Sequence, residues 1–375
     1  MKRVGRVLVA VCVGSSLLAG GVFGQSIPPQ LKTSPSIDKA SAQAIELAVT
    51  TNVKKLADAN PDAQRQAREA LIGEVRAAGA EPSAAFMAAY SEALGNAVMK
   101  LPKDVDVRAL LNAAIVVARV AEITKSPKLE PVILWLLGEN QPEAIKLWGM
   151  KAARGIMPEL ARQNLHKKLL AQVVPTVKAH PTGAMTAEAY EALLLSDAAT
   201  MNELLNLVAL RASLYQGPAA PEDPNVDYTP FPFLSVKGWA ALQQPQRVRV
   251  LQLICSLMVL GARHGDAAEV NTLEKDQLTT LVQSVAKALE AIALQLGNQQ
   301  LRNVASNASR AVPMEPAAKE VCPAIRQIKG FEAVQEPSMN AGGEAPATPA
   351  GNGAAPGTGT GTGTGTGGGT TPPVR

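Results

Sequence analysis

The sequence lacks the short motifs of common enzyme and cofactor sites. It has no HExxH, CxxC or CxxCH, no GxSxG elbow, no phosphate loop, and no GxGxxG turn between a strand and a helix. Its three histidines are not spaced as a helix-borne metal pair. His264 with Cys255 and Asp266 could be written as a metal trio, but a helix-end histidine favoured by the helix dipole is the simpler interpretation. We therefore expect no metal and no cofactor, and the sequence identifies no catalytic residue.

Long apolar runs are also missing. The mainly apolar stretches 7–19 and 250–262 are both shorter than the roughly 20 residues that a transmembrane helix needs. For 250–262, apolar residues on all sides of so short a helix indicate burial between neighbouring helices.

Residues 1–24 have the layout of a secretory signal peptide. Basic residues come first, the apolar run 7–19 follows, and Val22 and Gly24 are small enough for the positions ahead of a cleavage site. A retained anchor helix is the alternative. We expect export to the periplasm or the cell exterior, with no transmembrane anchor after cleavage.

The net charge argues against general nucleic-acid binding. Removing the three basic residues of the signal, Lys2, Arg3 and Arg6, lowers the formal charge from +4 by three to about +1. We therefore expect no nucleic acid among the partners.

Aromatic residues make up 3% of the chain, while alanine and leucine are frequent, a composition that favours helices over strands. Helix starts recur, for example at Asn60–Pro61, Asp104, Ser126–Pro127 and Gln244–Pro245. No stretch alternates apolar and polar residues for long enough to predict a strand. The sequence predicts an all-α domain at 25–335, as an irregular α-solenoid of stacked helical hairpins or as a large helical bundle.

Two stretches, DVDVRALLNAAIVVARVAE from Asp104 and PEAIKLWGMKAARGIMPEL from Pro142, resemble first helices of HEAT or armadillo-type repeats. Their apolar-basic pairs lie 38 residues apart, close to the roughly 40 to 47 of such repeats. A third pair, at Val248–Arg249, comes 103 residues later and breaks the period. The resemblance covers mainly residues 60–175. It implies a curved stack of helix pairs that binds partners on its concave face, and it implies no catalytic residue.

Residues 139–160 form one expected helix with apolar side chains nearly all round. Ile145, Trp148, Ala152 and Ile156 make one stripe along it. We expect this stripe to be interior, with neighbouring helices on two sides.

The C-terminal segment 336–375 is rich in glycine, threonine and proline and has almost nothing to bury. Such a segment cannot offset the entropy of ordering, so the sequence predicts a disordered tail. The tail is either functional, as a spacer or a site for sugar attachment to threonine, or a neutral simple repeat.

Two cysteines, Cys255 and Cys322, remain after the signal is removed. In an oxidising compartment they could form a disulfide between C-terminal helices. Cys255 is embedded in apolar sequence, which favours a separate buried thiol instead.

Basic residues are concentrated between 146 and 178. A basic face for anionic glycans or envelope lipids is one interpretation, and a solvated outer face is the other. The candidate residues of the basic face are Lys151, Arg154, Arg162, Lys167 and Lys168.

The segment 217–238 is proline-rich and, with Trp239, gathers four aromatic residues in a chain that has few. We expect a long loop here. Either its rings plug an open end of the helical stack, or they form a docking site for a peptide or glycan. The candidate partner-binding residues are Tyr228, Phe231, Phe233 and Trp239.

Together these features favour an exported helical scaffold that binds another envelope protein or peptide. An enzyme with an unrecognised site in a helical cleft and a purely structural envelope component are the alternatives.

Overall fold

The structure is a computed structural model and describes residues 26–76, 81–102, 104–269 and 272–337. All of them belong to the first of two compact units, Met1–Met339. Within these residues the chain forms helices, turns and coil and no strand, which confirms the all-α prediction. The predicted signal peptide at 1–24 lies outside the described residues, as does the predicted tail from 338 onward.

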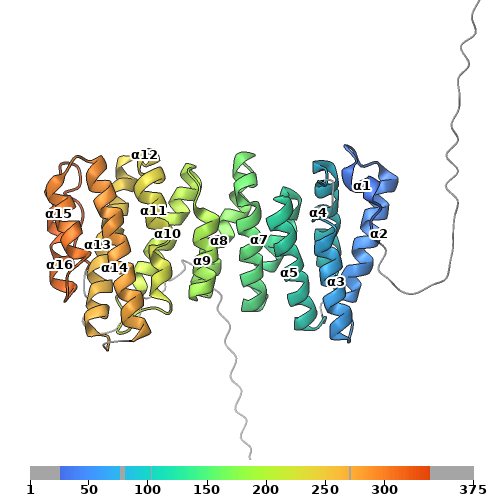
Figure 1. Cartoon of the computed structure of the whole chain (residues 1–375), viewed down its shortest axis with the longest axis horizontal. Coiled ribbons are helices and arrows are strands. Elements are labelled where there is room, and N and C mark those ends of the chain that lie inside the picture. The colour runs from blue at the N-terminus through green and yellow to red at the C-terminus, as the bar shows by residue number, and fades with distance from the viewer. Residues whose placement is uncertain (1–25, 77–80, 103, 270–271, 338–375) are drawn as a thin grey trace, which may run out of the picture. The chain divides into compact units, whose positions relative to one another are not determined.

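The regular elements follow one another along the chain (Figure 1). The α-helices are α1 (Pro29–Thr33), α2 (Lys39–Lys55), α3 (Pro61–Gly73), α4 (Ala84–Met99), α5 (Val107–Thr124), α6 (Glu130–Leu136), α7 (Glu143–Arg162), α8 (Lys167–Ala179), α9 (Gly183–Leu193), α10 (Ala198–Leu214), α11 (Pro230–Phe233), α12 (Trp239–Ala241), α13 (Gln244–Ala267), α14 (Leu273–Gln295), α15 (Gln299–Ala308), α16 (Glu315–Lys319) and α17 (Val321–Arg326). Short 3₁₀ turns are η1 (Pro127–Leu129) and η2 (Pro224–Tyr228), and η3 (Leu234–Gly238) is a π turn.

Capping side chains fix where the long helices begin. Asn60 accepts a hydrogen bond from the Asp62 amide at 2.9 Å at the start of α3, as the sequence predicts. Asp106 caps α5 by accepting from the Arg108 amide at 3.2 Å, two residues beyond the predicted start. Each cap satisfies a first-turn N–H group that has no partner inside the helix.

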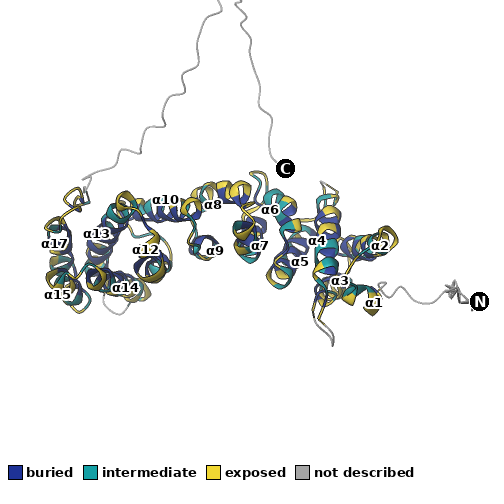
Figure 2. Cartoon of the chain, turned by 90° about the horizontal axis from the view of Figure 1, so that it is seen from above, coloured by how far each residue is buried: buried dark blue, intermediate teal, exposed yellow. Residues whose placement is uncertain are grey.

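The helices from α2 to α10 stack in two layers. In one layer α3, α5, α7 and α9 each pack on the next, and in the other α2, α4, α6, α8 and α10 do the same. Consecutive helices, such as α4 with α5 and α6 with α7, also contact one another, so they form hairpins that join the layers. Buried residues lie where neighbouring helices face each other (Figure 2). This is the stacked-hairpin arrangement, not a single central bundle.

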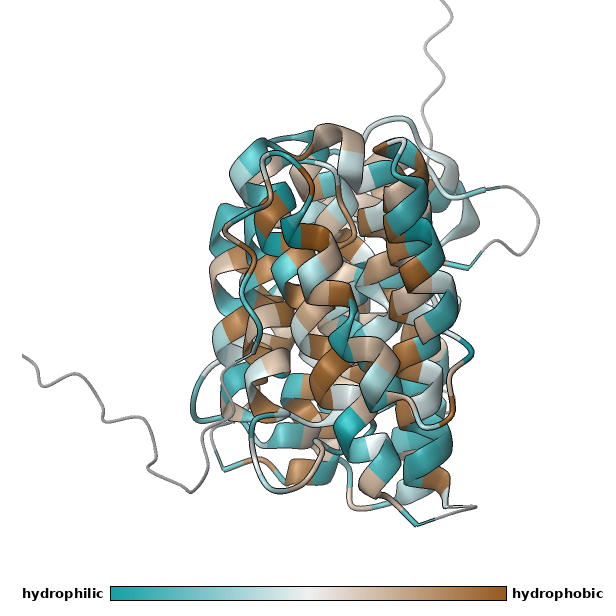
Figure 3. Ribbon diagram, turned by 90° about the vertical axis from the view of Figure 1, so that its left-hand side faces the viewer, coloured by the Kyte–Doolittle hydropathy of each residue, from teal (hydrophilic) through white to brown (hydrophobic). Residues whose placement is uncertain are grey.

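Beyond α10 the chain passes through η2, α11, η3 and α12. The long helices α13, α14 and α15 then pack successively, and α16 and α17 pack against them. Hydrophobic and hydrophilic residues are interspersed along the helices (Figure 3). No helix in the described ranges has both the length and the apolar character needed to cross a membrane.

Helix α7 contacts α5, α6, α8 and α9, and this explains the apolar surface of 139–160. Three positions of the expected interior stripe are fully buried: Ile145, Ala152 and Ile156. Trp148 is only half-buried and lines a surface groove, so the expectation that the whole stripe is interior is wrong at this residue. Ala118 and Gly155, which have little or no side chain, line the same groove and leave space beside the indole ring.

The segment 217–238 is not one loop. Residues 217–223 are turns and coil, and η2, α11, η3 and α12 follow with almost no interruption. Pro224 and Pro230 occupy first-turn positions of η2 and α11, where a missing N–H loses no hydrogen bond and the fixed φ suits a helical turn. Here the prolines start helical turns, whereas proline richness led us to expect a loop.

Candidate binding surfaces

The four aromatic residues proposed as a docking site do not share one surface. Phe231 and Trp239 are 1% and 3% exposed, while Tyr228 and Phe233 are half-buried. Trp239 stacks on Phe331 with ring centroids 6.4 Å apart, which joins α12 to the C-terminal part of the domain. Phe231 is packed in the core, so these two rings stabilise the fold. Phe233 is the member of the set that lines a groove.

This groove, here called the Phe233 groove, has a volume of about 660 Å³. It lies between the residues that follow α9 and the turns of α11 and η3. Its lining is mainly apolar, and Val236 is 62% exposed. Lys237 forms no ion pair within the described residues and is exposed. The residues that define the groove are Leu194, Leu195, Ser196, Thr229, Pro232, Phe233, Val236 and Lys237.

A buried ion pair anchors the segment that carries the Phe233 groove. Arg211 of α10 donates to Asp227 of η2 from Nε to Oδ1 at 2.8 Å and from Nη2 to Oδ2 at 3.0 Å, and neither side chain is exposed. Arg211 also donates to the carbonyl oxygens of Pro181 at 2.9 Å and Glu222 at 3.2 Å. A buried charge needs such a complete set of partners, so η2 is fixed to α10.

Two tyrosines complete the environment of the Asp227 carboxylate. Tyr190 donates to Oδ1 at 3.1 Å and Tyr215 to Oδ2 at 2.8 Å. Burial raises the pKa of both phenols well above the ordinary value, and the negative charge of Asp227 raises the pKa further. Both tyrosines therefore remain protonated donors at neutral pH.

A second groove crosses three successive helices of one layer. It has a volume of about 250 Å³, and we call it the Trp148 groove. Ala118 and Gly155 form part of its lining and leave room because they have little or no side chain. The larger residues around it are Arg119 and Glu122 of α5, Trp148, Lys151 and Arg154 of α7, and Glu188 of α9.

Two cations lie close to the Trp148 indole ring of this groove. The Lys151 ammonium lies 4.3 Å from the centroid of the Trp148 ring, and the Arg119 guanidinium carbon lies 5.9 Å from it. Both distances are within the range of cation–π attraction. Trp148 thereby holds two positively charged groups at the same groove.

Gly155 sets the spacing of α5 and α7 behind the Trp148 groove. A Cβ atom there would lie 2.9 Å from the carbonyl carbon of Ala121 and 3.0 Å from the amide nitrogen of Glu122. Carbon atoms in favourable contact are about 3.5 to 4.0 Å apart. Any side chain at this position would push the two helix backbones apart.

The five residues of the expected basic face fall into three separate places. Lys151 and Arg154 line the Trp148 groove, and Arg154 pairs with Glu188 at 2.9 Å. Arg162, at the end of α7, instead donates to Glu159 at 2.8 Å, and the hydrogen bonds from Arg162 and Gln163 lower the pKa of Glu159. The remaining two residues are exposed in the first turn of α8 and line neither groove: Lys167 and Lys168.

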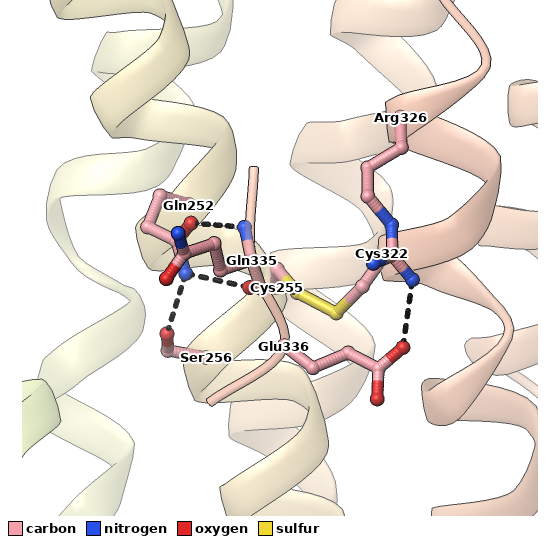
Figure 4. The surroundings of a disulfide bond; sticks show 7 residues. All are labelled: Gln252, Cys255, Ser256, Cys322, Arg326, Gln335 and Glu336. Carbon is pink, nitrogen blue, oxygen red and sulfur yellow. Dashed lines mark hydrogen bonds and ion pairs between the residues drawn. A yellow bond between two sulfur atoms is a disulfide. The ribbon is translucent and has the colours of Figure 1, made fainter. Parts of the chain in front are cut away.

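Cys255 of α13 and Cys322 of α17 form a disulfide with Cα atoms 5.5 Å apart, so the separate buried thiols favoured by the sequence are not what the structure shows. Close by, Gln252 exchanges two hydrogen bonds with the Gln335 backbone, at 2.8 and 2.6 Å (Figure 4). Glu336, expected to begin the tail, pairs with Arg326 at 2.8 Å. The ordered contacts thus extend one residue past the predicted boundary at 335.

No group of three or more His, Cys, Asp or Glu side chains within the described ranges could hold a metal ion. In the trio considered above, Cys255 is in the disulfide, and His264 Nε2 donates to the Tyr215 carbonyl at 2.9 Å. Asp266 accepts from the amides of Met314 at 3.0 Å and Glu315 at 2.7 Å. These three residues therefore serve the packing of α13.

No known protein family and no curated protein matches the chain. Among solved structures, an engineered protein from the Northeast Structural Genomics Consortium aligns over 63% of this chain and 98% of its own, with 12% identity and a TM-score of 0.40. A second engineered protein from that consortium aligns over 74% and 96%, with 15% identity and a TM-score of 0.30. Similarities of this size carry no information about function, and the resemblance to HEAT and armadillo repeats stays a prediction.

Two features of these surfaces were not found from the sequence. The Arg211–Asp227 pair joins residues 16 positions apart, and the only local signal was a single arginine within the apolar run of α10. The Trp148 groove draws on three helices, and Arg119 gives no sign in the sequence that it approaches Trp148.

Proposed function

We propose that this protein is an exported helical scaffold, periplasmic or extracellular, that binds another envelope protein. The occupant of the Phe233 groove would be an extended segment of that partner, with an apolar side chain against Phe233 and Val236. An acidic group of the segment would reach Lys237.

The observation that carries this proposal is an open apolar groove on a firmly anchored base. Val236 is 62% exposed beside a groove of about 660 Å³, and exposed apolar surface of this kind commonly marks a binding site. The buried Arg211–Asp227 pair fixes the preceding turn, η2. A groove that is already ordered loses little conformational entropy when a partner binds.

Three further features support the proposal. The signal-peptide layout of residues 1–24 favours export. The Cys255–Cys322 disulfide fits an oxidising compartment, where such bonds persist. Stacked helical hairpins, as in the repeat families that the sequence resembles, present extended surfaces to partners.

Photo-crosslinking from the groove tests this function. A photoreactive amino acid replaces Val236 in the chain expressed in its own cell, and the captured protein is identified by mass spectrometry and purified. The matched control places the same amino acid at Leu273, which is 73% exposed on α14 outside the groove. The proposal predicts one main adduct from position 236 that is missing from position 273.

The purified partner is then titrated against two equally charged variants. Val236→Glu should weaken binding by roughly tenfold or more, because a desolvated carboxylate in an apolar interface is unfavourable, while Leu273→Glu should have no effect. Equal affinity of both variants would refute the groove as the site. Point substitutions are preferable to deletion of 217–239, since that deletion would leave Arg211 buried without Asp227.

A further inference from the structure

We propose that the Trp148 groove is a second binding site, separate from the Phe233 groove, which takes one carboxylate side chain from an acidic peptide segment of a partner protein. The groove is formed by α5, α7 and α9 and shares no residue with the Phe233 groove. The inference therefore does not depend on the function proposed above.

The charges in the Trp148 groove leave one cation without a counterion. Arg119 pairs with Glu122 at 3.0 Å, and Arg154 pairs with Glu188 at 2.9 Å. Lys151 forms no ion pair in the described part of the chain, and its ammonium lies over the Trp148 ring. A single uncompensated positive charge favours a single carboxylate.

Arg119 is positioned to share that carboxylate with Lys151. Its guanidinium lies over the same ring, and its side chain and that of Glu122 are about half exposed, at 50% and 53%. Exposed pairs of this kind contribute little energy, so Arg119 can turn from Glu122 to an incoming carboxylate at small cost.

Three observations favour a peptide over an anionic glycan. The indole ring on which a sugar would stack already contacts two cations. Glu122 and Glu188 also lie in the lining, and they would repel the closely spaced charges of a sulfated chain. The volume of about 250 Å³ is below the roughly 300 to 1,000 Å³ of typical small-molecule pockets, which suits one side chain.

The test uses the full chain and an end-blocked pentapeptide, Ala-Ala-Glu-Ala-Ala, that carries a fluorescein label. Binding is measured by the fluorescence anisotropy of the peptide at low salt. The twin peptide Ala-Ala-Gln-Ala-Ala differs by one charge. We expect binding of the glutamate peptide that is at least about tenfold tighter than that of the glutamine twin, the usual scale for one charge-assisted hydrogen bond.

Lys151→Met should weaken binding of the glutamate peptide about tenfold, because methionine keeps the apolar packing on Trp148 and removes the charge. Lys167→Met removes the same charge from an exposed position on α8, so its affinity should stay within about twofold of the parent. Circular dichroism checks the fold, and Arg119→Gln is a second groove variant in case Lys151→Met does not fold.

Three outcomes overturn the proposal. The first is no binding of the glutamate peptide, or equal binding of both peptides. The second is an equal loss of affinity for the glutamate peptide in Lys151→Met and Lys167→Met, which indicates a general charge effect. The third is tighter binding of a sulfated tetrasaccharide that depends on Lys151, which assigns the groove to a glycan. Val236→Glu leaves the peptide affinity unchanged, and this separates the two sites.

Discussion

Arg211 and Asp227 form a bidentate ion pair, with Nε–Oδ1 at 2.8 Å and Nη2–Oδ2 at 3.0 Å, and neither side chain is exposed to solvent. The pair connects α10 to η2, and the Asp227 carboxylate also accepts from Tyr190 and Tyr215. The turn that precedes the Phe233 groove is therefore fixed by charge and hydrogen bonding as well as by apolar packing.

Breaking this pair should destabilise the protein strongly. Asp227→Asn keeps the size of the side chain but leaves the Arg211 charge buried without a counterion, so we expect a loss of about 3 to 5 kcal/mol in the free energy of unfolding. Urea unfolding followed by circular dichroism measures it. Asp223→Asn is the matched control on the same segment, because Asp223 is exposed, and its effect should be within about 0.5 kcal/mol. Equal effects would mean that the pair does not anchor η2.

The stability of the protein should fall as the pH rises above 10. Burial raises the pKa of Tyr90, Tyr190 and Tyr215 above their ordinary value of 10.0. Above that pH the unfolded chain loses these protons while the folded chain keeps them, so unfolding is favoured. Each tyrosine contributes up to about 1.4 kcal/mol per pH unit once its phenol is fully ionised in the unfolded chain.

Tyr90→Phe isolates one of these contributions. The variant loses the hydrogen bond from the Tyr90 hydroxyl to the Leu71 carbonyl, 2.7 Å long, at a cost of about 1 kcal/mol at neutral pH. Its free energy of unfolding should then fall less steeply between pH 10 and 11, by about 1 kcal/mol, because the unfolded phenol is half ionised at pH 10 and almost fully ionised at pH 11. An unchanged slope would show that the Tyr90 phenol ionises in the folded state.

Gly155→Ala should destabilise the α5–α7 contact by about 1 to 3 kcal/mol, since its Cβ would lie 2.9 Å from the α5 backbone. Gly73→Ala is the matched control. Gly73 is the last residue of α3, and a Cβ there would meet nothing within 4 Å. Removing the backbone freedom of glycine at such a site should stabilise the protein by about 0.4 to 1 kcal/mol. Thermal unfolding of the two variants should shift in opposite directions, and a shift of the same sign would contradict the close approach at Gly155.

Loss of the disulfide should lower the free energy of unfolding by about 4 kcal/mol, because the bond closes a loop of 67 residues and restricts the unfolded chain. The double variant Cys255→Ala and Cys322→Ala, compared with the parent in urea with and without reductant, measures this loss. Reductant should lower the stability of the parent and leave the double variant unchanged. A parent that is insensitive to reductant after complete unfolding would mean that the bond does not form in the protein.

The absence of strand patterns and the repeated helix starts were enough to predict an all-α fold, but they left stacked hairpins and a large helical bundle both open. These signals are local: a cap such as Asn60 and a proline in the first turn act within a few residues. Proline also misled the prediction for 217–238. Its proline richness indicated a loop, whereas Pro224 and Pro230 begin helical turns.

The sequence by itself determined three properties: a preference for helices over strands, the lack of a known catalytic motif, and apolar runs that are too short for a membrane span. Only the tertiary structure decided which residues meet. Arg119 approaches Trp148 because Gly155 allows α5 and α7 into backbone contact, and Arg211 finds Asp227 because η2 folds back onto α10. Such contacts depend on the packing of whole helices, and no periodicity within one helix encodes them.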